Sequence, residues 1–141
     1  MRIMALDLGE KTIGIAVSDS TGLIARGLET IRRRSLDSDF LRLKELIAAN
    51  EVSTVVIGYP KNMNGTIGER ARICESFADI VKEVFPDCEV LLWDERLSTV
   101  AAEKVLINAD MRRDKRKKII DMMAAVVILQ NYLDSRKRRI D

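Results

Sequence analysis

The stretch Arg2–Ser18, RIMALDLGEKTIGIAVS, decides the fold of this chain. Its first apolar run, Ile3–Leu6, is short and uninterrupted, which is typical of a central strand buried on both faces. A second run, Ile13–Val17, follows after residues 9–11, whose sequence Gly-Glu-Lys suits a tight hairpin connection. The stretch therefore predicts a β-hairpin, with Asp7 where the first strand ends.

Asp7 has two interpretations. A carboxylate beside a buried strand is costly to desolvate unless a cation or hydrogen bonds compensate it. In the plainer interpretation, Asp7 caps a turn through its side chain. In the sharper one, Asp7 anchors a metal ion, and the apolar residues on its flanks favour this second interpretation.

Composition predicts one globular domain spanning residues 1–141, because 47% of the residues are hydrophobic. The longest apolar run, Met122–Leu129, is too short to cross a bilayer, and Asp7 interrupts any secretory pattern at the N-terminus. Cys74 and Cys88 have no paired spacing, so we expect reduced thiols in a cytoplasmic protein.

The sequence contains no histidine. This excludes imidazole metal sites and Ser-His-Asp triads, and it removes the most usual general base. Hydrolytic chemistry would have to come from carboxylates, lysines, thiols or a metal ion held by oxygen ligands.

Basic residues are concentrated in runs although the net charge is only +2. The runs are Arg32–Arg34, Arg112–Lys118 and Arg136–Arg139. Such a run is most often a solvated face or tail. Several of them beside a candidate acidic metal site favour a phosphate-rich partner.

The remaining periodicity predicts alternating strands and helices. Strands are expected at residues 27–31, 55–57 and 89–93, and helices at 39–50, 69–85, from Ser98 or Thr99 onward, and at 117–133. Asp37 or Ser38 would cap the first of these helices, and the charged tail 134–141 would fray. The expected inner faces of the first two helices are Phe40, Leu41, Leu43, Leu46 and Ile47, and Ile73, Phe77, Ile80, Val81 and Val84.

Acidic residues with apolar surroundings occur at a few places: Asp7, the pair Asp94-Glu95, and Asp121. The first two places follow predicted strands, and Asp121 lies in the last predicted helix. Mg²⁺ prefers oxygen ligands and keeps several waters, so two or three carboxylates suffice to hold it. Two ions about 3.5–4 Å apart can stabilise both oxygens exchanged in phosphodiester cleavage.

Several motifs together resemble the YqgF (RuvX) family, which is similar to the RuvC resolvases of the ribonuclease H-like superfamily. They are Asp7-Leu8-Gly9-x-Lys11-x-Ile13-Gly14, Gly58-x-Pro60 with Gly65, Asp94-Glu95-Arg96, and Asp121-x-x-Ala124-Ala125-x-x-Ile128-Leu129. The resemblance implies an α/β, ribonuclease H-like fold with a five-stranded mixed sheet and helices on both faces. It also implies a Mg²⁺- or Mn²⁺-dependent nuclease that matures the 5′ end of pre-16S rRNA.

The same resemblance implies that Asp7, Glu95 and Asp121 are catalytic metal ligands, with Asp94 as a further ligand candidate. Superfamily members commonly carry their second acid after the fourth strand, where this chain has Gly58 and Pro60. The acid must then come from the Asp94-Glu95 pair, and either residue could supply it. The candidate nucleic-acid contacts are Lys11, Lys61, Asn62, Arg96, Arg113, Lys115 and Arg116.

Other functions stay open. A Holliday-junction resolvase acting on branched DNA would need two active sites, and hence a dimer, whereas an RNA-trimming enzyme could be a monomer. A non-catalytic RNA-binding factor for ribosomal precursor particles would not need the acids. An ATPase of the actin and sugar-kinase type shares the first hairpin motif, but it clamps nucleotide between two large domains.

Overall fold

A single mixed sheet of five strands forms the centre of the structure. The structure, a computed structural model, describes residues 1–60, 67–94 and 113–140, with the backbone alone at 113–121 and 137–140. The strands lie in the order β3-β2-β1-β4-β5. Their bounds are β1 Arg2–Leu8, β2 Thr12–Ser18, β3 Ala25–Arg32, β4 Val52–Tyr59 and β5 Glu89–Asp94.

β1 is the central strand of this sheet, as the apolar run at its start predicts. It pairs antiparallel with β2 and parallel with β4. Met4, Ala5 and Leu6 are almost completely buried because helices cover both faces of the strand. β2 pairs antiparallel with β3, and β4 pairs parallel with β5. The mixed sheet implied by the family resemblance is therefore confirmed.

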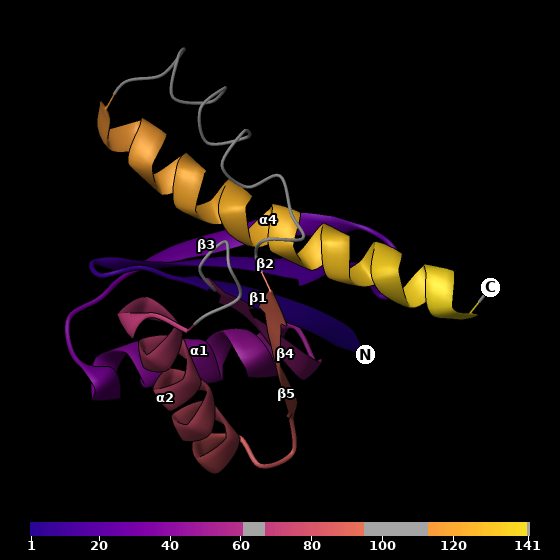
Figure 1. The fold of residues 1–141 in the computed structure, drawn as a ribbon, viewed down its shortest axis with the longest axis horizontal. Coiled ribbons are helices and arrows are strands. Elements are labelled where there is room, and N and C mark those ends of the chain that lie inside the picture. Colours follow the sequence, from indigo (N-terminus) through magenta and orange to yellow (C-terminus); the bar gives the residue numbers. More distant parts are fainter. Residues whose placement is uncertain (61–66, 95–112, 141) are drawn as a thin grey trace.

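Helices cover the two faces of the sheet unequally (Figure 1). α1 (Leu36–Ala49) and α2 (Glu69–Val84) lie on one face, and α4 (Arg113–Ile140) crosses the other. The helix expected from Ser98 or Thr99 lies outside the described residues. No helix in the described part of the chain combines the length and hydrophobicity needed to cross a membrane.

Side chains alternate along each strand and so form a separate core on each face. The core under α1 and α2 includes Met4, Leu6, Leu8, Ile13, Ile15, Val55, Ile57, Phe40, Leu43, Phe77 and Val81. The core under α4 includes Ile3, Ala5, Ala16, Val56, Ala124, Ala125, Ile128, Leu129, Tyr132 and Leu133.

α1 begins earlier than the sequence predicts. Ser35, and neither Asp37 nor Ser38, is the N-cap, and its side chain accepts a hydrogen bond from the Ser38 backbone N–H. A serine three residues before Ser38 satisfies an N-terminal N–H group equally well, so the cap could not be chosen from residue type alone. Leu41, expected on the inner face, is 61% exposed.

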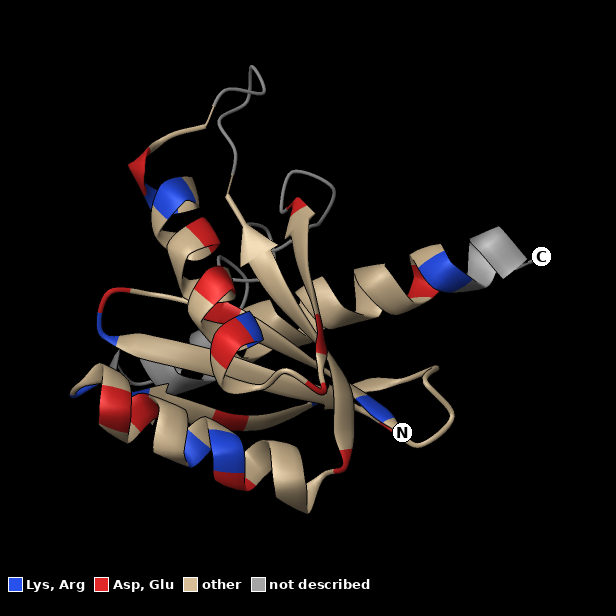
Figure 2. Ribbon diagram, turned by 90° about the horizontal axis from the view of Figure 1, so that it is seen from below, with Lys and Arg blue, Asp and Glu red and all other residues tan. Residues whose placement is uncertain are grey.

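α2 also buries a narrower stripe than expected. Ile73 and Val84 are 49% and 48% exposed, whereas the smaller Ala71, Cys74 and Ala78 are buried. Small side chains allow the helix to approach the sheet closely, and the larger ones lie at the margin of the contact. Figure 2 shows that acidic and basic residues line the outer surfaces of α1 and α2.

α4 is longer at both ends than the predicted helix. It begins at Arg113, within the basic run 112–118, and it continues to Ile140. The tail that the sequence predicts to fray is therefore helical up to Ile140. Arginine and lysine have high helix propensity, so the charged tail continues the helix beyond the part that packs on the sheet.

Candidate active site at the end of the central strand

Asp7 is the penultimate residue of β1, and its direction follows from the pleat of the strand. Met4, Leu6 and Leu8 belong to the core under α1 and α2, whereas Ile3 and Ala5 belong to the core under α4. By the same alternation, Asp7 lies on the face that α4 covers. The Asp7 side chain is half-buried there.

Glycines flank Asp7 on both neighbouring strands. Gly14 of β2 is its partner in the antiparallel ladder. On the other side, Leu6 pairs with Ile57, so the next position of β4 beside Asp7 is Gly58. Side chains at directly opposite positions would stand about 4.5–5.5 Å away. The neighbouring strands therefore place no side chain directly beside the Asp7 carboxylate on the α4 face.

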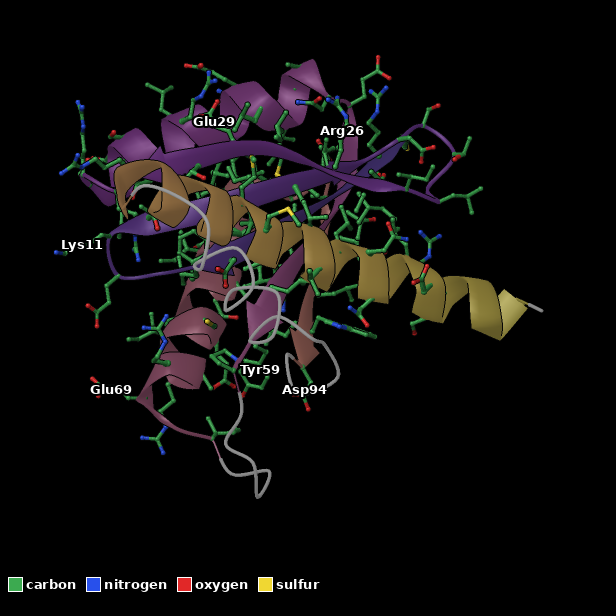
Figure 3. The ribbon with its side chains drawn as sticks, turned by 90° about the horizontal axis from the view of Figure 1, so that it is seen from above. Lys11, Arg26, Glu29, Tyr59, Glu69 and Asp94 are labelled. Carbon is green, nitrogen blue, oxygen red and sulfur yellow. The ribbon has the colours of Figure 1, made fainter. Side chains whose placement is uncertain are left out.

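Asp94 lies on the opposite face of the sheet. It ends β5 and pairs with Tyr59, which belongs to the core under α1 and α2. Figure 3 shows Tyr59 and Asp94 at the adjoining ends of β4 and β5. Burial raises the pKa of the Tyr59 phenol, and the neighbouring Glu75 carboxylate raises it further, so the hydroxyl stays protonated. Trp93, which pairs with Gly58, points toward α4 instead.

α4 is the element that faces Asp7, and it carries Asp121 close to its N-terminal end. Gly27 of β3 determines how closely this part of α4 approaches the sheet. A Cβ atom at Gly27 would lie 2.7 Å from both Cγ and Sδ of Met122, the residue after Asp121. The absence of a side chain at Gly27 thus allows α4 to lie close to the sheet at this point.

Comparison with known proteins identifies the family of this chain. The family model described as "RuvX: Holliday junction resolvase" matches residues 1–135. The chain belongs to the RuvX family. Its relatives include proteins named "Putative pre-16S rRNA nuclease" from Thermoanaerobacter pseudethanolicus, 54% identical over 99% of this chain and 100% of the relative, and from Desulforamulus reducens, 56% identical over 96% and 98%. These names support a nuclease.

Solved structures show the same fold. RuvC of T. thermophilus in complex with a Holliday junction substrate matches 97% of this chain and 96% of its own, with a TM-score of 0.60 and 12% identity. The fowlpox virus Holliday junction resolvase matches 96% and 99%, with a TM-score of 0.57 and 15% identity. The RuvX chain therefore has the RuvC-type, ribonuclease H-like fold.

The structure describes the predicted acidic ligands of this RuvX protein only in part. Asp7 and the helix that carries Asp121 are on one face, and Asp94 is on the other. Glu95 lies outside the described residues, and the side chain of Asp121 is not described. In the described part of the chain, no three acidic, cysteine or histidine side chains gather into a metal-binding group.

The structure likewise describes only some of the predicted nucleic-acid contacts. Lys11 is exposed at the tip of the β1–β2 hairpin and points away from the sheet (Figure 3). Arg113, Lys115 and Arg116 lie in the first turns of α4, where only the backbone is described. Lys61, Asn62 and Arg96 lie outside the described residues.

Two arginines that the sequence did not single out contact the turn after Asp7. Arg33 donates a hydrogen bond from Nη1 to the Gly9 carbonyl oxygen at 2.7 Å. Arg70 of α2 donates from Nη2 to the Leu8 carbonyl oxygen at 3.1 Å. In the sequence, Arg33 is only one member of the basic run Arg32–Arg34. Its position directly after β3, the strand that pairs with β2, is the signal that could have placed it near the hairpin.

Arg33 is held by a buried carboxylate. Its Nε lies 3.6 Å from Oδ2 of Asp39, which is only 2% exposed. The second oxygen of Asp39, Oδ1, accepts a hydrogen bond from the Arg34 backbone N–H. The loop after β3 is therefore fixed to α1, and through Arg33 to the hairpin turn. Arg33 is therefore not part of a merely solvated face, which is the usual role of such a basic run.

Proposed function

We propose that this RuvX chain is a Mg²⁺- or Mn²⁺-dependent endonuclease that acts on precursors of 16S rRNA. The observation that carries the proposal is the position of Asp7, a half-buried carboxylate beside Gly14 and next to the position of Gly58, on the face covered by the helix of Asp121. The names of the relatives supply the substrate, and the shared fold supports cleavage of a phosphodiester bond.

The residues present fit a hard divalent ion. The chain has no imidazole ligand, and its candidate donors are carboxylate oxygens, which Mg²⁺ and Mn²⁺ prefer. The flanking glycines leave room for an ion that retains part of its water shell. When bound, such an ion would supply Lewis-acid stabilisation of the charge that develops on the phosphate.

The chain's own residues would hold that ion and orient the substrate. Asp7 would act as a ligand fixed by a strand that is hydrogen-bonded on both sides, which keeps the carboxylate in place. Asp121 would be the ligand from the helix. Of the pair Asp94-Glu95 at the end of β5, Glu95 is our choice of ligand, because Asp94 lies on the face opposite to Asp7 and alternation favours the next residue.

Basic residues would bind the phosphate backbone on either side of the site. Lys11 at the hairpin tip and Arg113, Lys115 and Arg116 in the first turns of α4 are the proposed contacts, together with Lys61, Asn62 and Arg96. Each neutralised phosphate should contribute about 0.7–0.9 to the slope of log K against log salt concentration.

A resolvase acting on branched DNA is the second candidate. The description of the family model and the likeness to RuvC favour it. Symmetric cleavage of a four-way junction would require two copies of this site, whereas trimming of an RNA end would require one.

A paired cleavage assay tests the proposal. The purified protein is offered a 5′-extended precursor rRNA stem and a four-way DNA junction, each with Mg²⁺, with Mn²⁺ and with EDTA. We expect metal-dependent cleavage of the RNA. Metal-dependent cleavage of the junction alone would favour the resolvase, and binding without cleavage of either substrate would favour a non-catalytic RNA-binding factor.

A further inference from the structure

A pocket opens on the other side of the turn that follows Asp7. It has a volume of about 200 Å³ and is lined by Leu8, Gly9, Glu10, Arg33, Arg70, Ile73 and Cys74. Since one water molecule occupies about 30 Å³ of liquid, the pocket can hold a phosphate group together with some water. Gly9 is two residues from Asp7 and therefore lies within about 8 Å of it, measured between Cα atoms.

The charge on this pocket comes mainly from Arg70. Arg33 also lines the pocket, but Asp39 offsets its charge. Among the described side chains, no carboxylate lies within 4.0 Å of the Arg70 guanidinium. Arg70 is exposed and uses one N–H for the Leu8 carbonyl, which fixes the guanidinium while leaving other N–H groups for a ligand. Glu10, which also lines the pocket, is the opposing charge.

We propose that this pocket, with Arg70 as its principal donor and Arg33 as the residue that positions the turn, binds a non-scissile backbone phosphate of the nucleic acid. A planar guanidinium suits a phosphate because it can donate two parallel hydrogen bonds. The pocket lies on the α1 and α2 side of the sheet, whereas Asp7 faces α4, so it would hold a phosphate other than the one that is cleaved. This subsite deepens the proposed function and rests on it for the identity of the ligand.

The test is a binding titration in EDTA, so that no turnover is required. A fluorescein-labelled RNA stem-loop with a single-stranded 5′ extension is titrated with wild-type protein, Arg70→Ala and Arg70→Gln over a range of salt concentrations. Gln keeps an N–H donor and removes the charge. We expect both variants to bind about tenfold more weakly at low salt and to lower the salt slope by about 0.7–0.9.

Arg72→Ala is the matched control, because Arg72 is also exposed on α2 but does not line the pocket. Arg72→Ala should show the same salt slope as the wild-type protein, and Glu10→Gln should strengthen binding. An unchanged slope in both Arg70 variants, or an equal loss in Arg72→Ala, would overturn the proposal. Loss of binding only in Arg70→Ala, with a lowered melting temperature, would reduce Arg70 to a structural tether and also overturn it.

The two proposals fail in different ways. One outcome is that the wild-type protein cleaves neither substrate while both Arg70 variants still show a lower salt slope of binding. In that case the nuclease function is wrong and the phosphate subsite stands. If cleavage is present and the slope does not change, the subsite is wrong and the nuclease stands. In cleavage assays with Mg²⁺, Arg70→Gln should raise KM and change kcat by less than about twofold. The reason is that the lost contact binds the substrate and the transition state equally well.

Discussion

Asp7 and Gly14 lie directly opposite each other in the β1–β2 ladder, so a glycine faces the candidate metal ligand across the hairpin. Gly14 is buried on the face that α4 covers. A side chain at this position would occupy the space beside the Asp7 carboxylate, because cross-strand Cβ atoms are only about 4.5–5.5 Å apart.

Gly14→Val should therefore reduce both stability and cleavage. Overpacking should cost about 1–3 kcal/mol of unfolding free energy, and displacement of the carboxylate should reduce cleavage about 100-fold. Ala16→Val is the control, since Ala16 is buried on the same face opposite Ala5, away from Asp7. Urea unfolding and single-turnover cleavage compare the two. Equal losses of activity would show that the space beside Asp7 has no special role.

The faces of β5 distinguish the two candidate acids, Asp94 and Glu95, at its end. Asp94 pairs with Tyr59 on the face opposite to Asp7, so we expect Asp94→Asn to retain most activity. Glu95→Gln should reduce cleavage by at least about 100-fold if Glu95 is the ligand. Cleavage rates in Mg²⁺ decide the ranking, and the reverse order would make Asp94 the ligand.

The contact between Gly27 and Met122 predicts a destabilising collision. Gly27→Ala would place Cβ 2.7 Å from Met122 Cγ and Sδ, which forces either the thioether or α4 to move. We expect a loss of about 1–3 kcal/mol. A double-mutant cycle with Met122→Ala, measured by urea unfolding, should show that the second change relieves the first. Strict additivity would mean that the two residues do not press on each other.

The pair formed by Glu29 and Arg42 predicts a modest dependence of stability on pH. Arg42 donates to both carboxylate oxygens of Glu29, and these hydrogen bonds lower the pKa of Glu29 in the folded protein. A carboxyl whose folded pKa is depressed stabilises the fold above its unfolded pKa, near 4.5, and loses that contribution as the pH falls through the folded value. Glu29→Gln should be less stable than wild type at pH 7, with the difference shrinking below about pH 4.5. A difference independent of pH in urea titrations would contradict this account.

The sequence predicted the sheet well because its signals were local. The uninterrupted run Ile3–Leu6 is what a strand covered on both faces requires, and the polar residues 9–11 mark the hairpin that places Asp7 at its end. β4 pairs parallel with β1, as a strand that follows a crossover helix does.

The remaining features depend on contacts between distant residues. Ser35 was chosen over Asp37 and Ser38 as a cap by the geometry of the loop after β3, where Arg33 and Arg34 contact Asp39. Arg70 and Leu8 are 62 positions apart, and no periodicity indicates that one contacts the other. Which of Asp94 and Glu95 shares a face with Asp7 could be argued only once the register of β5 was known.

The central claim is that Asp7 holds a divalent ion required for cleavage, and Asp7→Asn tests it most directly. The exchange keeps the shape of the side chain and removes its negative charge. The measurement is cleavage of the 5′-extended rRNA stem in Mg²⁺ by wild type and Asp7→Asn, with thermal melts of both proteins with and without millimolar Mn²⁺. We expect the variant to fold and to bind RNA, to cleave more than about 100-fold more slowly, and to lose most of the metal-induced rise in Tm. Wild-type cleavage by Asp7→Asn, with an unchanged metal-induced shift, would contradict the account and return Asp7 to the role of a turn cap.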